Sequence, residues 1–420
     1  MAELKLIAGL DIGNGYVKGR VMVPGSAPTD IDMPSAVRVL VTSHNVPVEP
    51  DLIGEVVSNI HNEMDAVFSS PQVEGSARHL FGRRGVEYGS GNLREFRVDA
   101  SHDTKARNEL TFMLIFGCVA GKAVQAYYEM NHRLPPASET IDAHVDLATA
   151  LPIQEFQMYR NELRHKLMDS QHMVFLHNFE EVISVRITFD AVDVIAEGGA
   201  AQQAIQQGGV VLMNSLLGDL MKMDKVMPGI ADRLKNVTAE GMLAAKRSIG
   251  VDIGEGTVNF PVMNGNRLSN DLSSTMNTGY GVVLNDALAA LRRRKMGIHT
   301  RKALTEYLND GPSVADREIY DAIQGVVNLY VDSFADDIVK EFAGIISATG
   351  STTNVIYVYG GGATPLRPVL YEKLLRCCEE SLGGVRMAPP ILYLDSRYSR
   401  NLNRGGLFIQ ATRLSQAAAQ

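Results

Sequence analysis

Residues 6–23 read LIAGLDIGNGYVKGRVMV, and residues 247–263 read RSIGVDIGEGTVNFPVM. In both stretches an apolar run ends in Asp-Ile-Gly-x-Gly and is followed by a second apolar run. Each pattern predicts a strand, a tight glycine turn and an antiparallel return strand. Because the copies lie domain-scale distances apart, the repeat predicts two domains of similar plan, each carrying one hairpin.

Strand and helix patterns alternate through the rest of the chain. Strand character is found at 145–151, 182–189 and 355–359, and helix character at 110–130 and 155–168. Such alternation indicates an α/β fold in which helices cover the sheets.

Residues 214–246 differ from this pattern because they are rich in helix formers and in methionine. The methionines in and beside this segment are Met213, Met221, Met223, Met227 and Met242. Two interpretations remain open, a packed helical insertion or a contact for a partner or second subunit, since methionine suits adaptable interfaces.

Composition narrows the class of protein. The 420 residues are 45% hydrophobic, and the formal net charge is -8. A chain this acidic is a poor general binder of nucleic acid, because such binding requires clustered Lys and Arg.

The three cysteines have no disulfide or zinc spacing, and the N-terminus lacks a signal-peptide pattern, so we expect a cytoplasmic protein. The apolar stretch 110–119 is too short to span a bilayer and predicts a buried helix, without direct membrane attachment.

The two glycine turns carry the chemistry. A glycine turn between strands presents backbone N–H groups to a phosphate, and two such turns can hold a polyphosphate from both sides. Asp11 and Asp252 end the preceding strands, where a carboxylate can hold Mg²⁺. Lys18 can reach a phosphate as a point charge, and Thr257 offers a hydroxyl.

A third glycine element follows the strand predicted at 355–359, in the sequence YGGGATP of residues 359–365. Gly360, Gly361 and Gly362 there suit close passage beside a flat base or sugar. Alone this triplet is an ordinary loop, but its place after the two hairpins strengthens the prediction of a nucleotide site.

The ordered series of motifs resembles the superfamily of actin, the heat-shock chaperone ATPases and the sugar kinases, and within it the ParM-type plasmid-segregating bacterial actins. The resemblance implies a duplicated, ribonuclease H-like α/β fold with a nucleotide cleft between two domains. It places the first domain at 1–205 and the second at 206–399, with a helical insertion at about 213–245. Residues 400–420 form a C-terminal helix that returns to the first domain.

The resemblance also implies roles for individual residues. The first phosphate loop comprises Asp11, Gly13, Asn14, Gly15 and Lys18, and the second comprises Asp252, Gly254, Glu255, Gly256 and Thr257. The nucleoside is contacted by Gly279, Gly281 and Gly360–Gly362, and the final helix contributes Asn403 and Gly405.

Glu197, in VIAEGGAA at residues 194–201, matches the glutamate that orients or deprotonates the attacking water. Together with Asp11 and Asp252 it completes the implied catalytic set. The competing interpretation is an acid at a helix N-terminus, where the helix dipole favours it.

Three features depart from the family pattern. Ala196 stands where relatives often have proline, and the interval from Glu197 to Asp252 is long. Glu255 puts a negative charge inside the second phosphate turn, where it repels a phosphate unless it points away or toward Mg²⁺.

The implied function is binding and hydrolysis of ATP or GTP with Mg²⁺, coupled to self-association into filaments. A DNA-binding adaptor is then expected to link the filament to a plasmid. In-line attack of water on the γ-phosphate is the expected chemistry.

Two alternative functions remain open. One is a small-molecule kinase, although no sugar-binding signature is found, and the other is a non-polymerising switch ATPase. A chaperone or divisome role is less consistent with the short C-terminal segment.

A basic run, Arg292–Lys295, ends a helical pattern in NDALAALRRRK. It is either a solvated helix end, where cations are favoured, or a contact to a subunit, adaptor or DNA.

Overall fold

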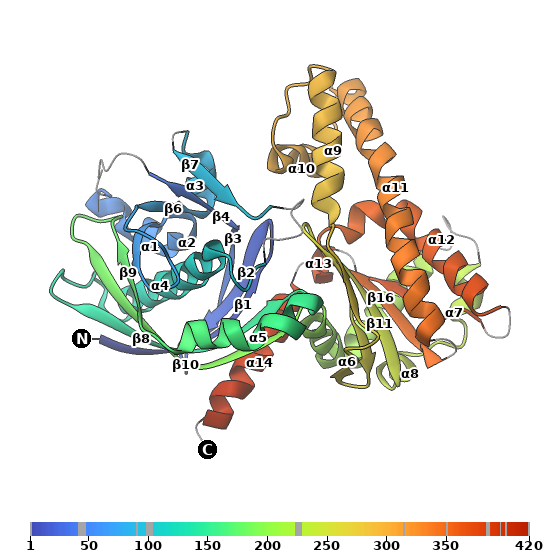
Figure 1. Cartoon of the computed structure of the whole chain (residues 1–420), viewed down its shortest axis with the longest axis horizontal. Coiled ribbons are helices and arrows are strands. Elements are labelled where there is room, and N and C mark those ends of the chain that lie inside the picture. The colour runs from blue at the N-terminus through green and yellow to red at the C-terminus, as the bar shows by residue number, and fades with distance from the viewer. Residues whose placement is uncertain are drawn as a thin grey trace. The chain divides into compact units, whose positions relative to one another are not determined.

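The structure is a computed structural model that describes residues 2–40, 48–89, 91–97, 104–222, 229–313, 316–349, 352–383, 387–394, 396–399 and 401–418. The chain divides into two compact units (Figure 1). Unit 1 comprises Met1–Ala204 and Asn401–Gln420, and unit 2 comprises Ile205–Arg400.

Unit 1 contains one large sheet with helices packed on it. Its described strands are β1 (Ala2–Ile12), β2 (Tyr16–Met22), β3 (Thr29–Pro34), β4 (Ala36–Val39), β5 (Asp65–Ser69), β6 (His79–Phe81), β7 (Asn92–Glu95), β8 (Thr140–Leu151), β9 (His172–Leu176) and β10 (Ile183–Ala196). Its described helices are a 3₁₀ turn (Pro50–Leu52), α1 (Ile53–Ser58), α2 (Ile60–Glu63), α3 (Gly82–Glu87), α4 (Glu109–Asn131), α5 (Ile153–Met168) and α14 (Leu402–Ala418). The strands follow the order β3-β2-β1-β8-β10-β9-β5-β6-β4-β7.

The centre of this sheet contains the first predicted hairpin. β1 pairs with β2 in antiparallel orientation, with Asp11 opposite Lys18, so the hairpin prediction for residues 6–23 is confirmed. On its other side β1 runs parallel to β8, and β8 runs parallel to β10. The carboxyl ends of β1, β8 and β10 therefore lie at one edge of the sheet, the edge where open α/β sheets bind ligands.

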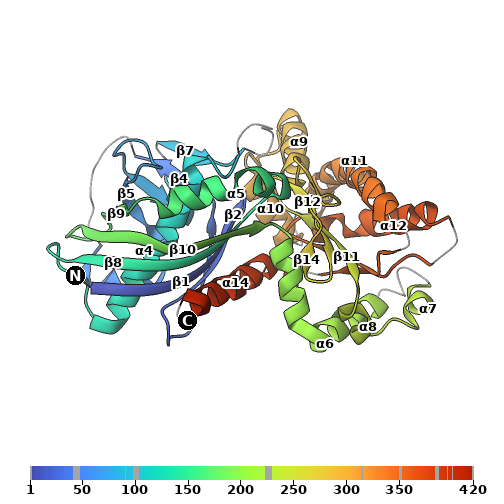
Figure 2. The ribbon, with the colours of Figure 1, turned by 60° about the horizontal axis from the view of Figure 1, so that its bottom comes forward.

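Helices cover both faces of the central strands. Even-numbered residues of β1, such as Leu6 and Leu10, belong to the large core that α4 completes. Ile7, on the opposite face, packs in a smaller cluster with Leu407 and Ala411 of α14. This alternation follows from the two-residue period of a strand. Figure 2 shows α14 running along β1.

α4 confirms the helix predicted at 110–130 and the prediction that it is buried. By length and composition it could cross a membrane, but its most apolar window is 100% buried inside unit 1. The apolar stretch is longer than the ten residues identified in the sequence, because Gly121 and Ala123 continue it past the buried Lys122.

Unit 2 contains a smaller sheet. Its described strands are β11 (Arg247–Ile253), β12 (Val258–Phe260), β13 (Val262–Asn264), β14 (Arg267–Leu268), β15 (Ser274–Met276), β16 (Val355–Tyr359) and β17 (Ile391–Tyr393). Its described helices are α7 (Ile230–Leu234), α8 (Ala239–Leu243), α9 (Tyr280–Arg293), α10 (Arg301–Asp310), α11 (Arg317–Thr349), α12 (Ala363–Ser381) and α13 (Ser396–Ser399). α6 (Gly199–Met221) starts in unit 1 and continues into unit 2, with a non-helical residue at Gly209. The long helices α9, α11 and α12 pack side by side (Figure 1).

The centre of the second sheet repeats the plan of the first. β11 pairs in antiparallel orientation with β12 and β13 and runs parallel to β16, which runs parallel to β17. The hairpin predicted at 247–263 is therefore confirmed. Its return strand is divided at Pro261, because proline cannot donate to the ladder.

The remaining element predictions agree with the structure in type but less well in length. The strand at 355–359 matches β16, whereas β8 begins before 145 and β10 extends to Ala196, which brings Glu197 to its end. The described part of residues 214–246 contains the end of α6 and the short helices α7 and α8, with a turn between α7 and α8. Met213 and Met242 are buried and Met221 is exposed, while Met223 and Met227 lie outside the described residues.

The basic run lies at the C-terminal end of α9, as expected of a helix end. Arg292 and Arg293 lie in its last turn, and Arg294 is its C-cap residue. Arg292 donates a 2.8 Å hydrogen bond to the carbonyl of His299.

Candidate functional site

The two glycine turns have the same backbone geometry. In unit 1 the Gly13 N–H donates to the Tyr16 carbonyl over 3.1 Å, and in unit 2 the Gly254 N–H donates to the Thr257 carbonyl over 2.9 Å. In both hairpins the aspartate lies opposite the residue seven positions later. One local structure is thus built twice.

The reason for glycine at these positions is space. A Cβ at Gly13 would lie 2.6 Å from the Tyr16 carbonyl oxygen, and one at Gly254 would lie 3.0 Å from that of Thr257. Neither residue has a positive φ. Close packing of the turn, rather than a left-handed conformation, therefore excludes a side chain here.

In unit 1 the predicted site residues gather at the carboxyl edge of β1, β8 and β10. Asp11 lies near the end of β1, and Glu197 follows the last residue of β10. The Glu197 N–H donates a 2.7 Å hydrogen bond to the carbonyl of Leu151, the last residue of β8. Both carboxyl side chains are buried, with residue exposures of 7% each.

Charges surround Asp11. Burial raises the pKa of Asp11 and the charge of Glu197 adds to this effect, while Lys18, Lys105 and a hydrogen bond with Asn403 oppose it. Asn403 belongs to α14, so the predicted return of the final helix brings this side chain to the first turn. Asp11, Lys18, Glu197 and Asn403 thus form one cluster in unit 1.

Glu197 is engaged by a residue that the sequence did not indicate. The Lys105 ammonium lies 2.7 Å from Glu197 Oε1, and both side chains are almost completely buried. Burial would lower the pKa of Lys105, but the charges of Glu197, Asp11 and Glu155 outweigh it, so the pKa lies above its ordinary value. Lys105 is therefore a cation at neutral pH.

Ser35, which the sequence analysis did not identify, stabilises the first turn through two hydrogen bonds. Its N–H donates to the Gly15 carbonyl over 2.9 Å, and its hydroxyl donates to the Gly13 carbonyl over 2.6 Å. A phosphate cradle requires N–H groups toward the ligand and carbonyls directed into the protein. Ser35 holds two carbonyls in that way.

In unit 2 two further glycine segments contact the second turn and the end of β11. The Tyr280 N–H donates to the Gly254 carbonyl over 2.9 Å, and the Gly281 N–H donates to the Glu255 carbonyl over 2.8 Å. A Cβ at Gly279 would lie 2.4 Å from that same Glu255 oxygen, so only glycine fits.

The third glycine segment reaches the end of β11. The Gly362 N–H donates to the Ile253 carbonyl over 2.9 Å. Gly360 has a φ of +97°, and a Cβ there would lie 2.7 Å from Asp252 Oδ1. Glycine at this position keeps the space beside the Asp252 carboxylate open. The predicted residues of unit 2 therefore come together at one edge of its sheet.

The charge of Glu255 has a partner. Arg301, in the first turn of α10, places Nη1 3.3 Å from Glu255 Oε1. The carboxylate thus points toward a guanidinium, which compensates the negative charge that the sequence left unexplained.

The residues present fit a Mg²⁺-nucleotide. Asp11 and Asp252 are carboxylates of the kind that Mg²⁺ prefers, and each ends a strand beside a glycine turn. Among the described residues, no cluster of three or more histidine, cysteine, aspartate or glutamate side chains could hold a metal ion by itself. Mg²⁺ usually keeps several waters and binds one or two carboxylates together with phosphate oxygens, and these two aspartates would suffice for such binding.

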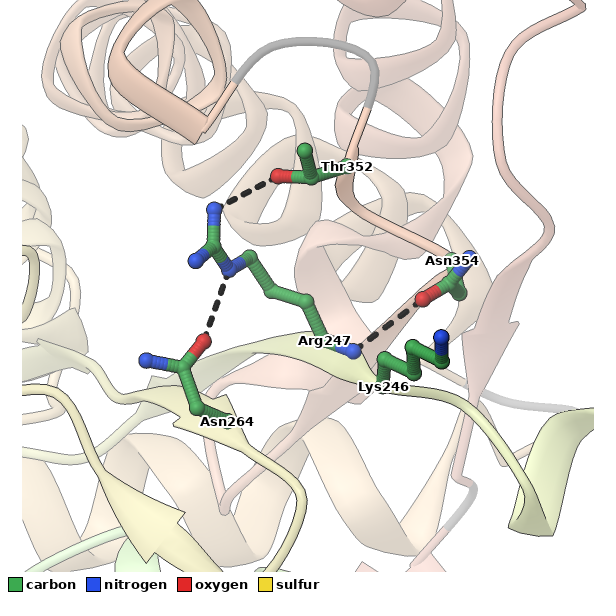
Figure 3. A pocket seen from close by; sticks show the side chains of 5 residues that line it. All are labelled: Lys246, Arg247, Asn264, Thr352 and Asn354. Atoms are coloured by element: carbon green, nitrogen blue, oxygen red, sulfur yellow. Dashed lines mark hydrogen bonds between the residues drawn. The ribbon is translucent and has the colours of Figure 1, made fainter.

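A separate pocket of about 400 Å³ lies at the opposite end of β11 (Figure 3). Arg247 in this pocket donates to Asn264 over 2.8 Å and to Thr352 over 2.5 Å. Because Arg247 begins the strand that Asp252 nearly ends, the pocket lies about 17 Å from Asp252 along the strand. It is not part of the glycine site.

Known proteins share this architecture. The family described as "Archaeal actin homologue MreB-like, C-terminal" matches residues 250–372. The crystal structure of Ta0583, an archaeal actin homologue, superposes with a TM-score of 0.57 at 16% identity and covers 98% of this chain and 99% of its own. Bacillus thuringiensis ParM with ATP gives 0.57 at 14% identity, with 98% and 99% covered. Ta0583 in complex with ADP gives 0.56 at 15% identity, with 98% and 100% covered. No curated protein matches the chain by sequence.

The resemblance inferred from the motifs is thereby confirmed for the fold. At 14–16% identity the superpositions show the fold alone. The chain has the actin-like fold over nearly its whole length.

Proposed function

We propose that the chain is a Mg²⁺-dependent nucleoside triphosphatase that holds its nucleotide through the two glycine turns. The observation that carries this proposal is the repetition of one turn geometry, with an aspartate at the same register, in two units. Structures of ParM with ATP and of Ta0583 with ADP make adenine nucleotides the first candidates, with GTP as the alternative.

In the proposed site each residue has a defined task. Backbone N–H groups of the turns at 13–16 and 254–257, other than those of Gly13 and Gly254 that bond within the turns, bind the phosphates, and Lys18 adds a positive charge. Gly279, Gly281 and Gly360–Gly362 leave room for the sugar and base. Bound Mg²⁺, held by Asp11 and Asp252, supplies positive charge that stabilises the phosphoryl oxygens.

Glu197 orients the attacking water and accepts its proton as the oxygen bonds to the γ-phosphorus and the bond to the leaving diphosphate breaks. The competing role, an acid favoured at the N-terminus of α6, predicts a loss of stability rather than of turnover when Glu197 is replaced.

We further propose that the nucleotide drives self-association into filaments, and that an adaptor links the filament to DNA, as in plasmid segregation. The support is the likeness in fold to ParM.

Right-angle light scattering with ATP or GTP and Mg²⁺, measured together with phosphate release and negative-stain microscopy, tests this proposal directly. Filaments that disassemble as phosphate appears are the expected result. Phosphate release without filaments would favour a switch ATPase, and release only with an added hydroxylated substrate would favour a kinase.

Glu197→Ala provides the sharpest test of the chemistry. We expect this variant to bind nucleotide and to hydrolyse it about 100-fold more slowly than wild type, which is a typical contribution of a general base. Nucleotide affinity by calorimetry and phosphate release under single-turnover conditions separate the two effects. Wild-type turnover in the variant would remove Glu197 from the mechanism.

A further inference from the structure

Lys105 occupies a turn that is fixed without the help of its own side chain. The Arg107 and Asn108 N–H groups both donate to the Thr104 carbonyl over 3.0 Å. Helix α5 anchors the turn from outside, because Glu155 accepts a 3.2 Å hydrogen bond from the Ala106 N–H. The turn does not need the Lys105 ammonium to keep its shape.

A second anchor acts two residues after Lys105. The Arg107 guanidinium pairs with Glu162 of α5 over 2.8 Å and lies over the Tyr159 ring at 4.4 Å from its centroid. The turn is thus attached to α5 through the two residues that directly follow Lys105.

The Lys105 side chain is instead directed into the carboxylate cluster. Its ammonium lies 2.7 Å from Glu197 Oε1 and has a side-chain exposure of 6%. Asp11 and Glu155 are close enough to raise its pKa. One buried cation therefore faces three carboxylates, and a charge is buried at such cost only when it is paired.

We propose that Lys105 is a positioning residue for hydrolysis, which holds the Glu197 carboxylate in its working orientation and compensates the charges of Asp11 and Glu155. This inference rests on the proposed function. Lys105 acts through Glu197 and not by binding the nucleotide, so its removal lowers the rate of hydrolysis more than the affinity for substrate.

A double-mutant cycle tests this role, with Lys105→Met, Glu197→Gln and the double variant. We expect Lys105→Met to slow hydrolysis of ATP at least tenfold with the Kd for ATP within threefold of wild type. The double variant should hydrolyse at the rate of Glu197→Gln alone, because the Glu197 carboxylate that Lys105 positions is absent from both variants. Lys105→Arg, which keeps the charge, should recover part of the rate.

Urea unfolding without nucleotide gives a second readout. Lys105→Met leaves Glu197 buried without its cation and should lower the unfolding midpoint, and the added Glu197→Gln should restore much of it. Lys122→Met is the matched control, since Lys122 is also buried in unit 1 but bonds Thr29 Oγ1 over 2.9 Å. This control should lower stability without a comparable loss of hydrolysis rate.

The outcomes separate the inference from the proposed function. If wild type releases no phosphate with ATP or GTP, the proposed function fails and the inference fails with it. If wild type hydrolyses and Lys105→Met does so at the same rate, the inference alone is overturned. Multiplying effects in the double variant, or a large loss of ATP affinity in Lys105→Met, would equally overturn a role exerted through Glu197.

Discussion

At the scale of single residues, the second phosphate turn poses an electrostatic problem. A carboxylate within a turn that binds phosphates would oppose the ligand by Coulomb repulsion. In this chain Glu255 lies 3.3 Å from Arg301 Nη1, and Nη1 is buried without a hydrogen bond in the described part of the chain. The pair makes the local charge near zero, which reconciles Glu255 with a phosphate site.

Removal of the arginine should expose this repulsion. We expect Arg301→Ala to weaken nucleotide binding about fivefold, which corresponds to roughly 1 kcal/mol for a pair that is partly exposed. Glu255→Gln should bind at least as tightly as wild type, and the double variant should regain most of the affinity lost in Arg301→Ala. Titration calorimetry at two salt concentrations measures these changes. Equal weakening in the single and double variants would mean that Arg301 serves the ligand and not Glu255.

At the scale of elements, the docking of α14 on unit 1 depends on the absence of side chains. The backbone of α14 approaches β1 so closely that a Cβ at Gly9 would lie 2.4 Å from the Phe408 nitrogen. On α14 itself, a Cβ at Gly406 would lie 2.0 Å from the Ala200 carbonyl oxygen. This close packing also sets the position of Asn403 beside Asp11.

Two adjacent glycines of α14 allow a matched comparison. Gly406→Ala should destabilise the protein by about 2 kcal/mol or more, because the backbone contact must open. Gly405→Ala should be neutral or stabilising by up to about 1 kcal/mol, because its nearest neighbour would be 3.8 Å away and alanine favours the helix. Thermal unfolding of both variants measures the difference. A similar loss in both would show that helix propensity, not the approach to Ala200, governs the effect.

The elements also show what could be predicted from sequence. The two hairpins and the strand at β16 follow from local patterns, since turn chemistry and strand period act over a few residues. The Lys105–Glu197 and Arg301–Glu255 pairs join residues far apart in the chain, so only tertiary packing creates them. The predicted strands are too short for two reasons. The continuously buried part of β8 begins only at Val145, and the alternation of β10 is interrupted where its register shifts between Phe189 and Ala191.

At the scale of the whole molecule, the two units differ in their titratable groups. Nine of the ten histidines lie before residue 205, and His299 is the remaining one. Burial lowers the pKa of His61 to about 4, and it also lowers the pKa values of His79, His172 and His177. All four belong to unit 1, so acid should affect that unit first.

The direction of the change in stability with pH follows from the protons that the unfolded chain binds. An unfolded histidine has a pKa near 6.5, so between about pH 6.5 and pH 4 the unfolded chain binds protons that folded unit 1 excludes. The free energy of unfolding of unit 1 should therefore be at its full value above pH 6.5 and fall as the pH drops. His61 alone accounts for about 3 kcal/mol by pH 4 at 1.4 kcal/mol per pKa unit. Hydrogen exchange at pH values from 7.5 to 5, read by mass spectrometry after correction for intrinsic rates, should show protection falling first in peptides of unit 1.

His61→Gln supplies the control, because a neutral amide can still donate to the Cys118 carbonyl that His61 contacts over 3.1 Å. The variant loses the group that the unfolded chain protonates, so the stability of unit 1 should vary less steeply with pH than in wild type. An unchanged pH dependence would show that carboxylates, rather than this buried imidazole, control the acid response. Equal loss of protection in peptides of unit 2 would show that the units unfold together, whatever group is titrated. The prediction requires two results together. Protection must fall first in peptides of unit 1, and the stability of unit 1 must depend less steeply on pH in His61→Gln than in wild type. The free energies of unfolding of the two units would then depend differently on pH.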